Sequence, residues 1–145
     1  MAYNVYSLPD VKAIAYHQDV GQCNLHGSGR GKMVITRSGD ISSHTTTADG
    51  YVVVNRMAST NGAITIEIPQ NSIADWFFRR WATYQKNLQN PSRVALGVIT
   101  VQDTVAGLTI TATGVSLQKI PDRSYDRTSS NVVWTFLAAT ITDQG

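Results

Sequence analysis

Alternating apolar and polar residues that lead directly into a helical pattern make residues 63–88 the most informative part of the chain. Isoleucines occupy every second position of residues 64–68, with Thr65 and Glu67 between them. This period of two is typical of a strand that is buried on one face and solvated or partnered on the other. Pro69 cannot continue the hydrogen-bonded ladder, so we expect the strand to end there.

The helix that follows has a clear start signal and a wide apolar surface. Ser72 can act as the N-cap, and Asp75, three residues later, can reach back in a capping-box pattern. We expect the helix to end near Asn90 and Pro91. An apolar stripe about 80° wide is formed by Ile73, Phe77, Trp81, Tyr84 and Leu88. This stripe is the expected core-facing side of the helix.

Two aromatic residues and one arginine of the same helix lie outside the stripe. Trp76 and Phe78 flank it on opposite sides, and Arg80 lies at its edge. A helix that lies on a single sheet would leave at least one of these large aromatics in water. Two interpretations remain open: an aromatic-rich core helix beneath a loop, or a helix that contacts a second copy of the protein.

Outside the helix the pattern is that of strands and turns. Residues 51–58 are predicted to pair with residues 63–68, because Asn61 and Gly62 form a strong tight-turn signal between them. This pairing is the best-supported hairpin in the sequence. Further strands are predicted at residues 11–17, 32–37 and 131–142.

A second hairpin is predicted between residues 93–102 and 108–119. Gly97 and Gly114 interrupt its two strands, as expected where a sheet bends or bulges. Together the elements predict a mainly β fold with one α-helix, arranged as an antiparallel β-barrel or as two packed sheets. Without a linker or an internal repeat, residues 1–145 are expected to form a single domain.

The charge of the chain is low and nearly balanced. Twelve Lys and Arg residues against ten Asp and Glu residues give a net charge of +2, which is atypical of a dedicated nucleic-acid-binding protein. Charged residues make up 15% of the chain, below the roughly 25% usual in globular domains. A neutral polar surface of this kind can be buried between subunits without stripping water from many ions.

Membrane and disulfide signals are weak. No stretch approaches the roughly 18 apolar residues of a membrane span, and the first ten residues do not form a secretion signal, so we expect no membrane insertion. Cys23 is the single cysteine, which excludes an internal disulfide and a cysteine-based metal site.

Motifs that would indicate catalysis or cofactor binding are incomplete. The glycine-rich residues 27–32 resemble a phosphate-binding loop, but Met33 replaces the hydroxyl that would bind magnesium, and a strand follows in place of a helix. Ser43 and His44 lie in a polar stretch that lacks a nucleophile elbow. The three histidines do not have metal-ligand spacing. We therefore expect no catalytic residue, no cofactor and no metal site.

Three segments carry a resemblance that covers most of the chain. They are the polar residues 38–50 leading into YVVVNRM, the string TIEIPQNSIADWFFRRW at residues 65–81, and residues 113–141, which contain K-x-P-D and W-T-F. In their order and in these motifs they resemble the tail-tube proteins of contractile-tailed bacteriophages. The motifs are patterns of folding and packing and not of catalysis.

The resemblance implies a small β-barrel or paired-sheet core with a flanking helix. It further implies hexameric rings that stack into a hollow tube for DNA, inside a tail with sheath and baseplate proteins. Such a protein would be part of the virion, assembled in the cytoplasm of the bacterial host, and would not be an enzyme. Passing DNA must not stick, so we expect weak, nonspecific or undetectable DNA binding.

The resemblance also suggests which residues build the tube. Residues 38–50 would form an extended loop that reaches the next ring, and charges that alternate in sign after Pro121 suggest ion pairs in solvent or between subunits. The candidate contacts between subunits or rings are Ser42, His44, Thr46, Asp49, Trp76, Phe78, Arg80, Arg123 and Asp126. The candidates for a polar sheet face or lumen are Thr65, Glu67, Thr109, Thr111 and Thr113.

Other functions stay open at this point. The tube protein of a secretion system or of a phage-tail-like particle would share the ring and differ in cargo. A monomeric β-sandwich that binds a ligand such as carbohydrate could use the aromatics as a stacking platform, and its persistent monomeric size would distinguish it. A hydrolase that uses Ser43 and His44 is the third alternative.

Overall fold

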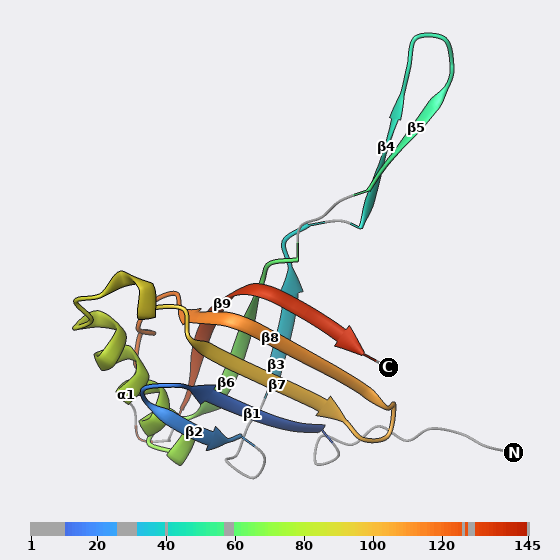
Figure 1. Cartoon of the computed structure of the whole chain (residues 1–145). Helices are drawn as coiled ribbons and strands as arrows, with labels where there is room; N and C mark the ends of the chain where they lie inside the picture. Colours follow the sequence, from blue (N-terminus) through green and yellow to red (C-terminus); the bar gives the residue numbers. More distant parts are fainter. Residues whose placement is uncertain are drawn as a thin grey trace, which may run out of the picture.

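The computed structural model describes residues 11–25, 32–39, 41–56, 60–125, 127 and 130–144. This part of the chain is mainly β, with one α-helix and one short 3-10 helix (Figure 1). The helices are α1 (Ile73–Lys86) and η2 (Pro91–Arg93). The strands are β1 (Val11–His17), β2 (Gly21–Asn24), β3 (Lys32–Arg37), β4 (Ser42–Thr46), β5 (Val52–Arg56), β6 (Gly62–Pro69), β7 (Gly97–Asp103), β8 (Leu108–Leu117) and β9 (Asn131–Gln144).

Seven strands form one antiparallel sheet in the order β2-β1-β7-β8-β9-β6-β3, and β4 pairs separately with β5. The two outer strands, β2 and β3, do not pair with each other within the described residues, so this sheet is open. The predicted mainly β fold with one helix is therefore confirmed, whereas the described residues do not form a closed barrel.

The predicted hairpin between residues 51–58 and 63–68 is wrong. β5 pairs with β4, with Thr46 opposite Val52 and Ser42 opposite Arg56. β6 instead has β3 on one side and β9 on the other, so both of its edges are occupied. The local turn signal at Asn61 and Gly62 therefore did not decide the pairing, because β3 and β9, which are distant from β6 in the sequence, occupy its two edges.

The second predicted hairpin is confirmed, together with its bulge. β7 pairs with β8, and the register shifts because Gly97 faces Val115 while Val98 faces Thr113. Gly114 is the extra residue and has a φ of +63°, a left-handed conformation that glycine adopts without strain. The bulge changes which residues point inward, from Ala112 before it to Val115 after it.

The start of α1 follows the predicted capping pattern. The side chain of Ser72 accepts a hydrogen bond from the Asp75 backbone N–H at 3.2 Å. Asp75 reaches back as expected, but its carboxylate accepts from the backbone N–H of Asn71 at 3.1 Å and not from that of the cap itself. The helix ends at Lys86, four residues before the predicted end at Asn90.

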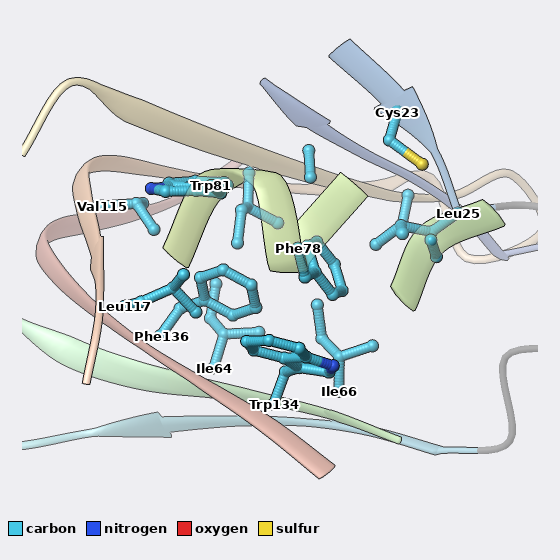
Figure 2. Packing of buried hydrophobic residues seen from close by; sticks show 14 of the residues in the cluster. Cys23, Leu25, Ile64, Ile66, Phe78, Trp81, Val115, Leu117, Trp134 and Phe136 are labelled. Carbon is cyan, nitrogen blue, oxygen red and sulfur yellow. The ribbon is translucent and has the colours of Figure 1, made fainter. Parts of the chain in front are cut away.

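The core lies between α1 and the sheet, which curls around the helix (Figures 1 and 2). Phe78 is fully buried, with its ring centroid 4.8 Å from that of Phe136 and 5.7 Å from that of Trp134. Ile73, predicted to face the core, is 75% exposed. The buried helix residues are Ala74, Asp75, Phe77, Phe78, Trp81 and Ala82. The inward face is therefore rotated from the predicted stripe.

Within the described residues, no helix is both long and apolar enough to span a membrane.

Candidate assembly surfaces

A two-stranded hairpin projects away from the rest of the molecule (Figure 1). This projecting hairpin consists of residues 41–56, and its turn is closed by a hydrogen bond from the Thr47 backbone N–H to the Tyr51 carbonyl at 2.8 Å. The predicted extended loop, residues 38–50, covers its first strand and its turn. The remainder of the molecule, formed by the seven-stranded sheet and α1, is called the body below.

The projecting hairpin has no core of its own. Ser43 is half-buried, and every other residue of the hairpin is exposed. The large apolar side chains and their exposed fractions are Ile41 88%, Tyr51 73%, Val52 56%, Val53 46% and Val54 64%. An isolated two-stranded hairpin is marginally stable in water, and clustered exposed apolar residues mark contact surfaces.

Four sequence candidates lie on this hairpin. Ser42, His44 and Thr46 alternate along β4 and therefore share one face, where they stand opposite Arg56, Val54 and Val52 respectively. Asp49 is exposed in the turn. The apolar valines on the same face were not recognised from the sequence as contact residues, because their strand was assigned to the body.

A second surface lies on the outward side of α1. Trp76 is 52% exposed, and the guanidinium carbon of Arg80 lies 4.8 Å from the centre of its ring, a cation–π contact. These two side chains border an open hollow of about 550 Å³, called the helix hollow below. The hollow is lined by Trp76, Arg79, Arg80, Thr83 and Tyr84. Phe78, named with them from the sequence, is inaccessible in the core.

The carboxylate of Asp75 joins α1 to the loop that precedes β9. It accepts hydrogen bonds from Arg123 at 2.9 and 3.1 Å and from the Trp134 indole N–H at 3.0 Å. Burial by itself raises the pKa of Asp75, but the hydrogen bonds from Arg123, Trp134 and Asn71 outweigh it and hold this pKa below its usual value. Arg123 thus has its partner within the same chain, and Asp126 lies outside the described residues.

A further polar cluster ties the turn after β1 to the end of α1. Asp19 accepts from the Nε of Arg93 at 2.8 Å and from the Tyr84 hydroxyl, and these hydrogen bonds lower the pKa of Asp19 to about 2. His17 is buried beside Trp81, and its Nδ1 accepts from the Asp19 backbone N–H at 3.0 Å. Burial lowers the pKa of His17. Through Asp19, this cluster connects the turn after β1 to Tyr84 of α1 and Arg93 of η2, all within the body.

The five candidates for a polar face lie together on the side of the sheet that faces away from α1. Thr65 and Glu67 alternate with the buried isoleucines of β6, and Thr109, Thr111 and Thr113 alternate with the inward residues of β8. We call this side the outer sheet face. Three further threonines, not singled out from the sequence, lie on the same face. Thr100 on β7 and Thr142 on β9 flank Thr111, and Thr135 on β9 lies beside Thr65.

The described residues contain no group of three or more His, Cys, Asp and Glu side chains that could hold a metal ion. His17 lies in the core and His44 on the projecting hairpin, so these two do not meet. Residues 27–31, which are most of the glycine-rich stretch 27–32, lie outside the described part of the chain.

Solved structures share this fold. A chain in the sheath–tube complex of an extracellular contractile injection system (PVC), in its extended state, aligns with a TM-score of 0.63 at 12% identity, covering 97% of this chain and 91% of that one. The sheath/tube terminator of the same system aligns with a TM-score of 0.63 at 12% identity over 100% of both chains. The tube-terminating cap of the anti-feeding prophage gives 0.61 at 9% identity, covering 99% and 93%. The fold is one that occurs in the tube and sheath assemblies of contractile systems.

The sequence itself identifies the family. Residues 3–144 match the family described as "Bacteriophage PhiTE tail tube protein". The chain belongs to this family, and it is a structural subunit of a tail tube. No curated protein matches it in sequence. The resemblance drawn from residues 38–50, 65–81 and 113–141 is confirmed.

Proposed function

We propose that copies of this chain form hexameric rings, and that these rings stack into a hollow tube through which phage DNA passes. Membership of the tail tube family supports the tube. The observation that supports assembly is the projecting hairpin, which exposes five large apolar residues and whose two strands pair only with each other among the described strands. A neighbouring subunit would remove this apolar surface from water.

The geometry of the chain suits a contact that repeats. A projecting arm and the surface that receives it are different parts of one molecule, so each copy can give and accept the same contact. Contacts of this head-to-tail type close into rings or continue as filaments. β2 and β3 are the outer strands of the sheet in the described residues, and neighbours in a ring could add strands beside them.

The outer sheet face is the proposed lining of the lumen. Its central strands carry a row of hydroxyls across Thr100, Thr111 and Thr142, and Glu67 adds a negative charge farther along the sheet. Tight binding of DNA needs many Lys or Arg contacts with phosphates. A surface with a hydroxyl-rich centre would let DNA slide, and this supports transient, nonspecific passage.

The tube would act within a virion tail that also contains sheath and baseplate proteins, and it would assemble in the cytoplasm of the bacterial host. Similar folds come from a sheath–tube complex, a terminator and a baseplate, and these likenesses support such partners. The proposed role is mechanical and involves no chemical step.

Electron microscopy and analytical ultracentrifugation of the purified full chain test the proposal. We expect six-fold rings or uniform hollow tubes whose amount increases with protein concentration. A folded monomer of 15.8 kDa that persists at high concentration would contradict it and favour a monomeric binding module. Assembled tubes that bind DNA tightly at physiological salt would contradict the conduit role alone.

A contractile injection system or phage-tail-like particle is the second candidate, because the similar folds come from such systems. The ring would be the same and the cargo would differ. Particles purified from producing cells distinguish the two, since nuclease-protected DNA is expected only for a phage.

A further inference from the structure

The helix hollow is lined by two arginines and two aromatic side chains. Arg79 has a carboxylate partner in its own chain, with its Nε 3.5 Å from Asp75. Arg80 has no carboxylate within ion-pair distance among the described residues, and its guanidinium rests on the ring of Trp76. The hollow therefore presents an arginine without an acidic partner beside a half-exposed indole.

The turn of the projecting hairpin has the complementary chemistry. Asp49 is the single carboxylate of residues 41–56, and it is exposed at the tip. Tyr51 lies two residues away and is 73% exposed. The tip is thus a small acidic and aromatic knob, and β4 and β5 carry it about 17 Å from its base.

The knob and the hollow of one chain cannot meet. In Figure 1 the hairpin extends from the sheet on the side away from α1, so its tip points away from the helix. A contact between them requires two copies. Because the knob and the hollow are on different parts of the subunit, the contact can repeat from copy to copy.

We propose that the hairpin tip of one subunit docks in the helix hollow of a neighbouring subunit, with Asp49 paired to Arg80 and Tyr51 packed against Trp76. This contact rests on the proposed tube and adds the position of the hairpin's receiving site. The arginine gains the acidic partner that its own chain does not provide among the described residues, and Thr83 offers a hydroxyl to the polar turn.

Reversing charges separately at the two positions tests the contact. Asp49→Arg places two cations together, and Arg80→Glu places two anions together, so each variant alone should raise the protein concentration needed for assembly at least about tenfold. The double variant restores the opposite charges and should assemble at nearly the wild-type concentration. Ultracentrifugation and electron microscopy provide the readout.

Mixing the two single variants gives a sharper test, because it separates contacts between copies from contacts within a copy. In the mixture each tip can find a hollow of opposite charge on the other variant, so tubes should form from two proteins that fail alone. Lys86→Glu is the matched control, since it makes the same charge reversal on α1 outside the hollow and should leave assembly unchanged. Thermal unfolding checks that every variant is folded.

The outcomes separate this contact from the tube itself. If the wild-type chain forms tubes and neither the double variant nor the mixture recovers assembly, the docking site is wrong and the tube stands. If Arg80→Glu alone forms tubes at the wild-type concentration, the hairpin tip does not pair with Arg80 and the proposal is overturned. If the wild-type chain never assembles, both the tube and the contact fail.

Discussion

β6 in the body and β5 in the projecting hairpin have similarly apolar sequences and opposite environments. Ile64, Ile66 and Ile68 of β6 are fully buried by α1 and β9, whereas Val52 and Val54 of β5 are more than half exposed. Apolar residues in a strand thus indicate that a surface will be covered without indicating by what. In the body the cover is the chain's own helix, and for the hairpin we infer that it is another subunit.

The largest effect on stability is expected from Phe78→Ala. Phe78 fills the space between α1 and the aromatic residues of β9, so its removal leaves a cavity and should lower the free energy of unfolding by about 3–5 kcal/mol. Urea denaturation of the dispersed subunit measures this change. Trp76→Ala is the matched control on the same helix, because its ring is half exposed and its loss should cost much less. Equal losses would mean that the two faces of α1 do not differ as described.

The next effect is expected from Asp75→Asn, which leaves the Arg123 guanidinium without its buried anion and should destabilise the body by about 3 kcal/mol. The folded-state pKa of Asp75 is depressed, so the unfolded chain takes up the proton first. The stabilisation is therefore complete above the unfolded-state pKa of about 3.9 and is lost as the pH falls through the lower folded value.

The free energy of unfolding, measured between about pH 6 and pH 2, tests this predicted loss of stability in acid. Carboxyl groups titrate in about this pH range. The stability of Asp75→Asn should vary less with pH below 4 than that of the wild-type chain. Parallel pH profiles for the two proteins would show that Asp75 does not contribute to the acid sensitivity of the body.

Local features of the fold could be predicted from the sequence. The strand at β6, the N-cap at Ser72 and the bulge at Gly114 each depend on a few neighbouring residues. The pairing of β5 was mispredicted because β3 and β9, which lie far from β6 in the sequence, occupy both edges of β6, and β5 pairs with the neighbouring β4 instead. The inward face of α1 was misjudged because Ala74 and Ala82, small residues that let the helix approach the sheet, carry little weight in a pattern of large side chains.

The candidate surfaces were also predicted only in part, because local signals are visible in the sequence and contacts between distant residues are not. Trp76 and Phe78 were both placed outside the apolar stripe, but Trp76 is exposed and Phe78 is buried. Residues 38–50 were predicted to form an extended loop, and residues 41–50 lie in the projecting hairpin. Arg123 was assigned to a subunit contact, yet its partner Asp75 lies 48 residues away in the sequence. A pairing at that separation has no local signal.

A smaller effect distinguishes glycines of the two regions. A Cβ at position 97 would lie 2.3 Å from the Trp81 ring and 2.7 Å from the Val115 carbonyl oxygen, so Gly97→Ala should destabilise the body by about 1–3 kcal/mol. A Cβ at position 50, at the hairpin tip, would meet no atom within 4 Å. The φ of +84° strains the backbone of an alanine there, but this strain is confined to the turn. Thermal unfolding should therefore separate the two, and a larger loss for Gly50→Ala would mean that the hairpin is part of the folding unit.

The smallest effect on stability, and the most direct test of the comparison, is expected from replacing Val52 and Val54 by serine. Both side chains are already exposed, so the free energy of unfolding of the dispersed subunit should change by less than about 0.5 kcal/mol for each. Assembly should nevertheless weaken, because the valines would lose the apolar contact that a neighbour provides. Val101→Ser, on the buried side of β7, is the matched control and should do the reverse by unfolding the body. Unimpaired tubes from the hairpin variant would mean that its exposed valines are not covered by another subunit, and the contrast with β6 would then be one of exposure alone.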